Sequence, residues 1–250
     1  MKVQKWQIQL AGALVLLTVS FYGIRWWLFP RPDFHNEMWR FLIGDVAFLF
    51  LQVLLVTMFI DRVAQKREKD EMRQKLNMIV GAFFSHTGTK LLGRIATADT
   101  ALPEVRDDLV PSMAWKPEDY ARASSAFRTH EPRVDLSACD LTALREQLSN
   151  QKDYLLGLLG NQSLLEHEQF TDLLWAVTHL AEELEARSDL GALSDTDARH
   201  IAIDVKRAYG LLGAMYLAYL SHLQANYPYL FSLAVRTNPL DPQARAEVTE

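Results

Sequence analysis

Histidine and carboxylate side chains are the residue types best suited to holding a metal ion, and the sequence places many of them on two predicted helices. These helices cover about 163–187 and about 194–226. Their candidate ligands are Glu166, His167, Asp172, His179, Glu182, Glu183, His200, Asp204 and His222. If the two helices were neighbours, a bundle metal site would be the chemistry to consider first.

The spacing of these residues nevertheless differs from that of a di-iron bundle, which needs inward-facing Glu and Glu-x-x-His on paired helices. The related spacing here is His179-x-x-Glu182, in the reverse order and only once. At about 100° per residue, His179 lies about 180° from Phe170 of the apolar stripe. Glu166 faces inward, but a role in helix capping already explains it. We therefore expect solvated side chains and caps, with no metal and no cofactor.

Nucleophilic and nucleotide chemistry have even less support in the sequence. Cys139 is the single cysteine, and it stands beside Asp140 without a histidine positioned by the local sequence. We interpret it as a free, reduced cytoplasmic thiol. The phosphate-loop, GxGxxG and GxSxG patterns are all absent. We therefore expect no catalytic residues.

The charge of the chain argues against a nucleic-acid partner. The net charge is −5, and residues 76–250 contain 15 basic and 24 acidic residues. A protein that binds nucleic acid needs a basic patch to neutralise phosphates. This part of the chain is acidic instead, so we expect no binding of nucleic acid.

The elements that carry these residues are predicted to be helices throughout, which makes the fold class all-α. An antiparallel bundle is expected over 138–240, from helices at about 138–159, 163–187 and 194–226 and a short closing helix at 229–236. The pattern Ser163-x-x-Glu166 has the form of a capping box at the start of the second helix. Residues 241–250 are expected to be a frayed tail.

The helix over 194–226 has a second face of small residues, which lets another helix approach closely. The residues of this face are Gly210, Gly213, Ala214 and Ala218. A helix that is apolar all round is usually central in a bundle. The small-residue face could meet the amphipathic 76–96 segment, the C-terminal turn or another subunit, so it is a candidate packing or oligomer face.

Residues 1–60 are predicted to form a transmembrane hairpin, which the mean hydropathy of −0.05 for the whole chain conceals. The two spans cover about 6–28 and 39–60, each near the roughly 20 apolar residues that a bilayer core requires. A cleavable signal peptide fits less well, because the first apolar run ends in Arg25-Trp26-Trp27 and a second run follows.

Basic residues after the second span set the expected orientation, since cytoplasmic flanks are rich in Lys and Arg. We therefore predict a multi-pass protein of the plasma (inner) membrane with both termini and the main domain in the cytoplasm. These flanking residues are Arg62, Lys66, Arg67, Lys69, Arg73 and Lys75.

Two charges inside the predicted spans are at matching depth. Arg25 and Asp45 each lie about 6 Å below the outer end of their helix, at about 1.5 Å per residue. An ion pair between them would reduce the cost of both intramembrane charges. One alternative is that each side chain reaches separately towards the headgroups. Another is that Asp45 has a role in transport.

Two segments connect the hairpin to the bundle. Residues 61–96 are predicted to continue as a solvated helix and then as an amphipathic helix, which either packs into the domain or lies on the membrane. Residues 97–137 contain four prolines and are expected to be an irregular linker with one short helix from about Glu118 to Arg128.

These observations together favour a membrane-anchored interaction or regulatory module without catalytic activity. Its partners would be the lipid bilayer and either another protein or further copies of itself. Two other hypotheses stay open. One is a subunit of an oligomeric channel or transporter, and the other is a sensor whose bundle holds a small ligand or a metal.

Overall fold

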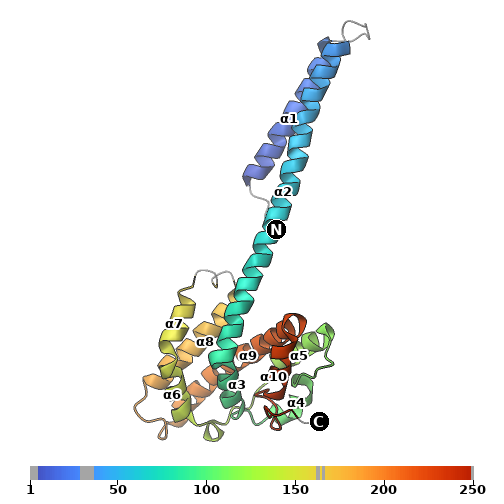
Figure 1. Ribbon diagram of the computed structural model, residues 1–250. Helices are drawn as coiled ribbons and strands as arrows, with labels where there is room; N and C mark the ends of the chain where they lie inside the picture. The colour runs from blue at the N-terminus through green and yellow to red at the C-terminus, as the bar shows by residue number, and fades with distance from the viewer. Residues whose placement is uncertain (1–4, 29–36, 162–163, 165–166, 249–250) are drawn as a thin grey trace. The chain divides into compact units, whose positions relative to one another are not determined.

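The computed structural model describes residues 5–28, 37–161, 164 and 167–248, and these residues form helices without a strand. The chain divides into two compact units, Met1–Glu71 and Met72–Glu250, and the boundary falls inside helix α2. Figure 1 labels the helices. Their bounds are α1 Lys5–Leu28, α2 Glu37–Phe83, η2 Phe84–Gly88, α3 Thr89–Ala96, α4 Leu102–Leu109, α5 Pro117–Thr129, η3 Leu136–Ala138, α6 Leu141–Asn150, α7 Lys152–Leu159, α8 Glu168–Glu185, α9 Asp195–Asn226 and α10 Pro228–Arg236.

The first unit consists of α1 and the adjoining part of α2, which run side by side in opposite directions (Figure 1). The rings of Phe21 and Phe50 are in contact, with centroids 5.5 Å apart. Near the C-terminal end of α1, the Arg25 guanidinium lies against the backbone of Gly44, where Nη1 would be 3.1 Å from an added Cβ. Both helices are long and apolar enough to cross a membrane.

The two predicted intramembrane charges lie on these helices. Asp45 is exposed and follows Gly44, the residue that Arg25 contacts. Among the described residues, no ion pair within 4.0 Å joins Arg25 and Asp45. Their pairing in a bilayer therefore stays a prediction.

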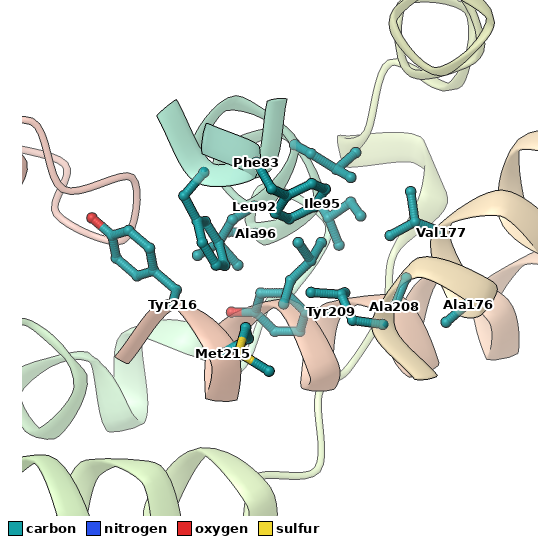
Figure 2. Packing of buried hydrophobic residues seen from close by; sticks show 14 of the residues in the cluster. Phe83, Leu92, Ile95, Ala96, Ala176, Val177, Ala208, Tyr209, Met215 and Tyr216 are labelled. Carbon is teal, nitrogen blue, oxygen red and sulfur yellow. The ribbon is translucent and has the colours of Figure 1, made fainter. Parts of the chain in front are cut away.

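The second unit is larger than the predicted bundle, because the segment before residue 138 supplies part of its core. Leu76, Phe83, Leu91 and Ile95 are all buried among side chains of the domain. Figure 2 shows Phe83 and the α3 side chains facing Tyr209 and other side chains of α9. The amphipathic 76–96 segment thus packs into the helical domain, and its apolar face is not left free.

A π-helical turn, η2, interrupts this amphipathic segment between α2 and α3. Gly88 ends the turn, and an added Cβ there would come within 2.6 Å of the Phe83 ring and 2.7 Å of the Phe84 ring. The absence of a side chain at Gly88 thus leaves room for both aromatic rings. Thr87 is buried in the same turn and donates a hydrogen bond of 3.1 Å to Gln151 Oε1.

Residues 97–137 are more ordered than the predicted linker, since they contain α4 as well as α5. Asp99 joins the two ends of this segment and is buried. Its carboxylate accepts hydrogen bonds from the backbone N–H of Ala101 at 2.9 Å and of Arg133 at 3.1 Å. The other carboxylate oxygen lies 2.5 Å from His130 Nε2. Sequence periodicity could not reveal the contacts to His130 and Arg133, because these residues are more than thirty positions away from Asp99.

The predicted bundle helices are present with changed boundaries. The segment predicted as one helix over 138–159 forms α6 and α7, which are separated at Gln151. The predicted helix over 194–226 is confirmed, and the Ser194 side chain accepts from the Asp197 N–H at its start. Helix α8 begins later than predicted, with His167 as its N-cap. The proposed Ser163 and Glu166 capping box lies outside the described residues.

The small-residue face of α9 receives α5 from the same chain. A Cβ added to Gly213 would overlap the ring of Phe127, whereas one added to Gly210 would meet nothing within 4 Å. Gly213 is therefore a position of close packing between α5 and α9, and Gly210 is an open position on the same helix.

This contrast gives a matched pair of stability variants. Gly213→Ala should lower the free energy of unfolding by about 1–3 kcal/mol, the usual cost of overpacking a core. Gly210→Ala should instead raise the free energy of unfolding by about 0.5–1 kcal/mol. The reason is that alanine has less backbone freedom than glycine in the unfolded chain and so loses less on folding. Thermal unfolding of the detergent-solubilised chain measures both changes. Equal effects of the two substitutions would contradict the assigned packing.

Candidate functional site

Four of the predicted candidate ligands meet where α8 and α9 pack against each other. His179 and Glu183 are one turn apart on α8, and His200 and Asp204 are one turn apart on α9. His179 Nε2 lies 3.8 Å from Glu183 Oε1 and 3.6 Å from Asp204 Oδ2. His200 Nε2 lies 3.3 Å from Glu183 Oε2 and 3.5 Å from Asp204 Oδ2. We call these four residues the His–carboxylate cluster.

Asp204 is the most buried member of the cluster. Its side chain is 3% exposed, while the imidazoles of His179 and His200 are 44% and 51% exposed. Within the described part of the chain, Asp204 Oδ2 is buried and has no hydrogen-bond partner. An unsatisfied buried carboxylate oxygen is unfavourable, so this atom needs a donor or a cation.

Two arginines bind carboxylate oxygens of the cluster. Arg207 contacts Asp204 Oδ1 at 2.9 Å. Arg187 contacts Glu183 Oε2 at 2.7 Å and Asp197 Oδ1 at 2.5 Å. The hydrogen bond from Arg187 is the main reason that the pKa of Glu183 falls below its ordinary value. Glu183 is therefore an ionised carboxylate whose orientation is fixed.

The chemistry open to this arrangement is cation binding by nitrogen and oxygen ligands. One atom each from His179, Glu183 and Asp204 lies within 4.8 Å of the other two, close enough to share a single ion. The sequence expectation of solvated side chains and caps did not foresee this geometry. The available signal was the i,i+4 spacing of a histidine and a carboxylate on each of two adjacent helices.

The remaining candidate ligands have other surroundings. His167 caps α8 by accepting a hydrogen bond of 3.1 Å from the Phe170 N–H at Nδ1. Asp172 and Glu182 are exposed on α8. His222 Nδ1 lies 3.1 Å from the side-chain nitrogens of both Asn77 and Asn226. None of these contacts brings the residue into the His–carboxylate cluster.

A groove of 720 Å³ lies between α5 and α9. Its volume is in the range of sites for small molecules. Burial raises the pKa of Tyr120, one of the lining residues, to about 12, so this hydroxyl stays protonated at neutral pH. Three of the predicted small-face residues, Gly210, Ala214 and Ala218, line this groove together with Tyr120, Ser124 and Phe127.

Cys139 is buried, and burial raises the pKa of its thiol. Its Sγ lies 3.8 Å from the backbone carbonyl of Arg94. A buried thiol with a raised pKa forms little thiolate and is a weak nucleophile. Cys139 is thus a free and buried thiol.

These features define a class of all-helical protein, with an apolar two-helix unit followed by a helical domain that contains the His–carboxylate cluster. Residues 72–236 match the model of the C-terminal helical domain of the uncharacterised protein MJ1433, and residues 2–64 match that of its N-terminal helical domain. MJ1433 of Methanocaldococcus jannaschii is 37% identical over 241 residues, which cover 96% of each chain. The chain belongs to the MJ1433 family. No solved structure matches it.

The arginine contacts predict how stability depends on pH. The pKa values of Glu183 and Asp197 are lowered from 4.5 and 3.8, in both cases mainly by Arg187. Their contribution is therefore present above these ordinary values and is lost as pH falls through the lower folded-state values. Arg187→Gln should reduce the free energy of unfolding at pH 7, and this deficit should shrink below about pH 4.

Denaturant unfolding at a series of pH values measures this deficit. Arg199→Gln is the matched control, because Arg199 is exposed on α9 and contacts the Asp195 carbonyl instead of a carboxylate. A deficit for Arg187→Gln that is constant from pH 3 to pH 7 would contradict the assigned ion pairs.

Proposed function

We propose that this chain is a membrane-anchored interaction or regulatory module without catalytic activity. The observation that carries this proposal is the exposed apolar surface of the first unit. In both apolar windows, beginning at Ala11 and at Phe41, only 6% of the residues are buried. Large side chains such as Leu16, Trp26 and Phe59 are at least 69% exposed. A bilayer is the environment in which such a surface is favourable.

The proposed location is the plasma (inner) membrane, with both termini and the helical domain in the cytoplasm. The support is the cluster of six basic residues between Arg62 and Lys75, just after the second apolar stretch. Lys and Arg are retained on the cytoplasmic side of a membrane. The family matches do not test this location, because MJ1433 is uncharacterised.

The proposed partner is another protein or a second copy of this chain, and the second unit offers a surface for it on α10. Phe231 anchors α10 in the core and is 1% exposed. Tyr229, Leu230 and Leu233 lie on one outer face of the helix and are 72%, 41% and 46% exposed. We call these three residues the α10 face. A contiguous exposed apolar face of this kind is typical of interaction sites.

Single-cysteine labelling tests the proposed topology in intact cells, with Cys139 changed to alanine. Trp26→Cys should react with a membrane-impermeant maleimide before the cells are opened. Lys69→Cys should react only after the membrane is permeabilised, because it lies in the basic segment. Labelling of Lys69→Cys in intact cells, or extraction of the chain from membranes by alkaline carbonate, would contradict the proposal.

Association through the α10 face is tested in mild detergent by cross-linking and by light scattering of the full chain. Leu230→Glu with Leu233→Glu should abolish self-association or recovery of a protein partner, because buried unpaired carboxylates are costly in an interface. Leu156→Glu on α7 is the control, since Leu156 is 47% exposed and lies on another helix. A monomeric wild-type chain that recovers no partner would remove the interaction role.

A further inference from the structure

We propose that the His–carboxylate cluster binds one divalent transition-metal ion of the Zn²⁺ type through His179, Glu183, His200 and Asp204. This site goes beyond membrane anchoring and partner binding, and neither of those depends on it. The ligand atoms assigned to the ion are the two imidazole Nε2 atoms, Glu183 Oε1 and Asp204 Oδ2.

Three of the separations between these atoms are close to those around a tetrahedral ion. Bonds of about 2.0–2.1 Å from nitrogen and oxygen place the corners of a tetrahedron about 3.3 Å apart. The measured separations from Asp204 Oδ2 to the two imidazole nitrogens are 3.6 and 3.5 Å. The separation from His179 Nε2 to Glu183 Oε1 is 3.8 Å. The ligand atoms of His179, Glu183 and Asp204 already lie within 4.8 Å of one another. The half-exposed His200 imidazole, 3.5 Å from Asp204 Oδ2, has to turn to join them.

The Asp204 carboxylate supplies a second and independent indication of a ligand. Its side chain is 97% buried, since 3% is exposed, and among the described residues Oδ2 accepts no hydrogen bond. That oxygen points at the two imidazoles, although neither forms a hydrogen bond with it. A cation between these groups would satisfy the buried oxygen, and the cost of leaving it unpaired would disappear.

The surroundings of the cluster match those of a metal site. Arg187 binds Glu183 Oε2 and Arg207 binds Asp204 Oδ1, the carboxylate oxygens that are not assigned to the ion, and contacts of this kind orient metal ligands. The four ligands carry two negative charges when the imidazoles are neutral, which balances one divalent ion. The ligands form two pairs, each one turn apart on its own helix, and the two helices pack together. His179, Glu183 and Asp204 are therefore largely preorganised.

The ligand set also selects the type of metal. Imidazole nitrogen suits Zn²⁺ and its transition-metal neighbours, whereas Mg²⁺ and Ca²⁺ prefer sites built from oxygen alone. Two imidazoles with two carboxylates are therefore expected to favour Zn²⁺ strongly over Mg²⁺. The half-exposed imidazoles leave the ion accessible from solvent.

Equilibrium dialysis of the full chain in detergent, purified without a polyhistidine tag, tests the proposal. The wild-type chain should retain one Zn²⁺ per chain by elemental analysis, should gain thermal stability with Zn²⁺, and should not respond to the same concentration of Mg²⁺. His179→Ala combined with His200→Ala should weaken Zn²⁺ affinity by at least about 100-fold, because changes outside the ligand shell alone cost 10–100-fold. Both imidazoles are half-exposed, so this variant is expected to fold.

Two control variants distinguish the cluster from histidines and carboxylates elsewhere on the chain. Glu182→Gln changes the exposed neighbour of Glu183, and His86→Ala removes an exposed histidine outside the cluster. Both variants should bind Zn²⁺ like the wild-type chain, while Glu183→Gln should bind weakly. The proposal is overturned if the wild-type chain binds no stoichiometric Zn²⁺, or if the double histidine variant binds as well as the wild type. Either result would assign the cluster to an ion-pair network only.

Discussion

Burial of α9 over more than one of its faces is the constraint on which the second unit depends. Its buried residues recur along nearly the whole helix, from Ile201 to Leu223. A single apolar stripe would need one neighbour, but this helix needs several. Helices α3, α5, α8 and α10 all contact it, and each covers a different stretch or side. The segments before residue 138 are drawn into the domain because the apolar surface of α9 requires them.

The same packing produces the His–carboxylate cluster and the groove between α5 and α9. Close packing of α8 against α9 brings the edges of both helices together, and the His–carboxylate cluster is formed at those edges. On another side, Phe127 of α5 occupies the space that Gly213 leaves open. Beyond that contact the side chains of α9 are small, and Gly210, Ala214 and Ala218 line the groove that remains open. Both features are thus consequences of how the central helix is covered.

The first unit differs from the second in how much of its apolar surface is exposed. Its helices contact each other, for example through Phe21 and Phe50, and most of their described large apolar side chains are exposed. The second unit instead buries its large aromatic side chains, including Phe83, Phe170 and Tyr216. The family models divide the chain in the same way, since the C-terminal model begins at residue 72, the first residue of the second unit. The two units therefore differ in how much of their apolar surface the chain itself covers.

Local sequence determined the helical class, the two apolar helices and the extent of α9, because helical periodicity and N-caps such as Ser194 act between neighbours in the chain. It did not determine the role of 97–137, where Asp99 is bonded to residues some thirty positions away. Nor did it reveal the cluster. A helical wheel gave the direction of His179 around the axis of its helix. The position of Asp204 relative to His179 depends instead on how α8 packs on α9. Only the tertiary structure decided that pairing, because contacts between helices join residues whose spacing in sequence carries no periodic signal.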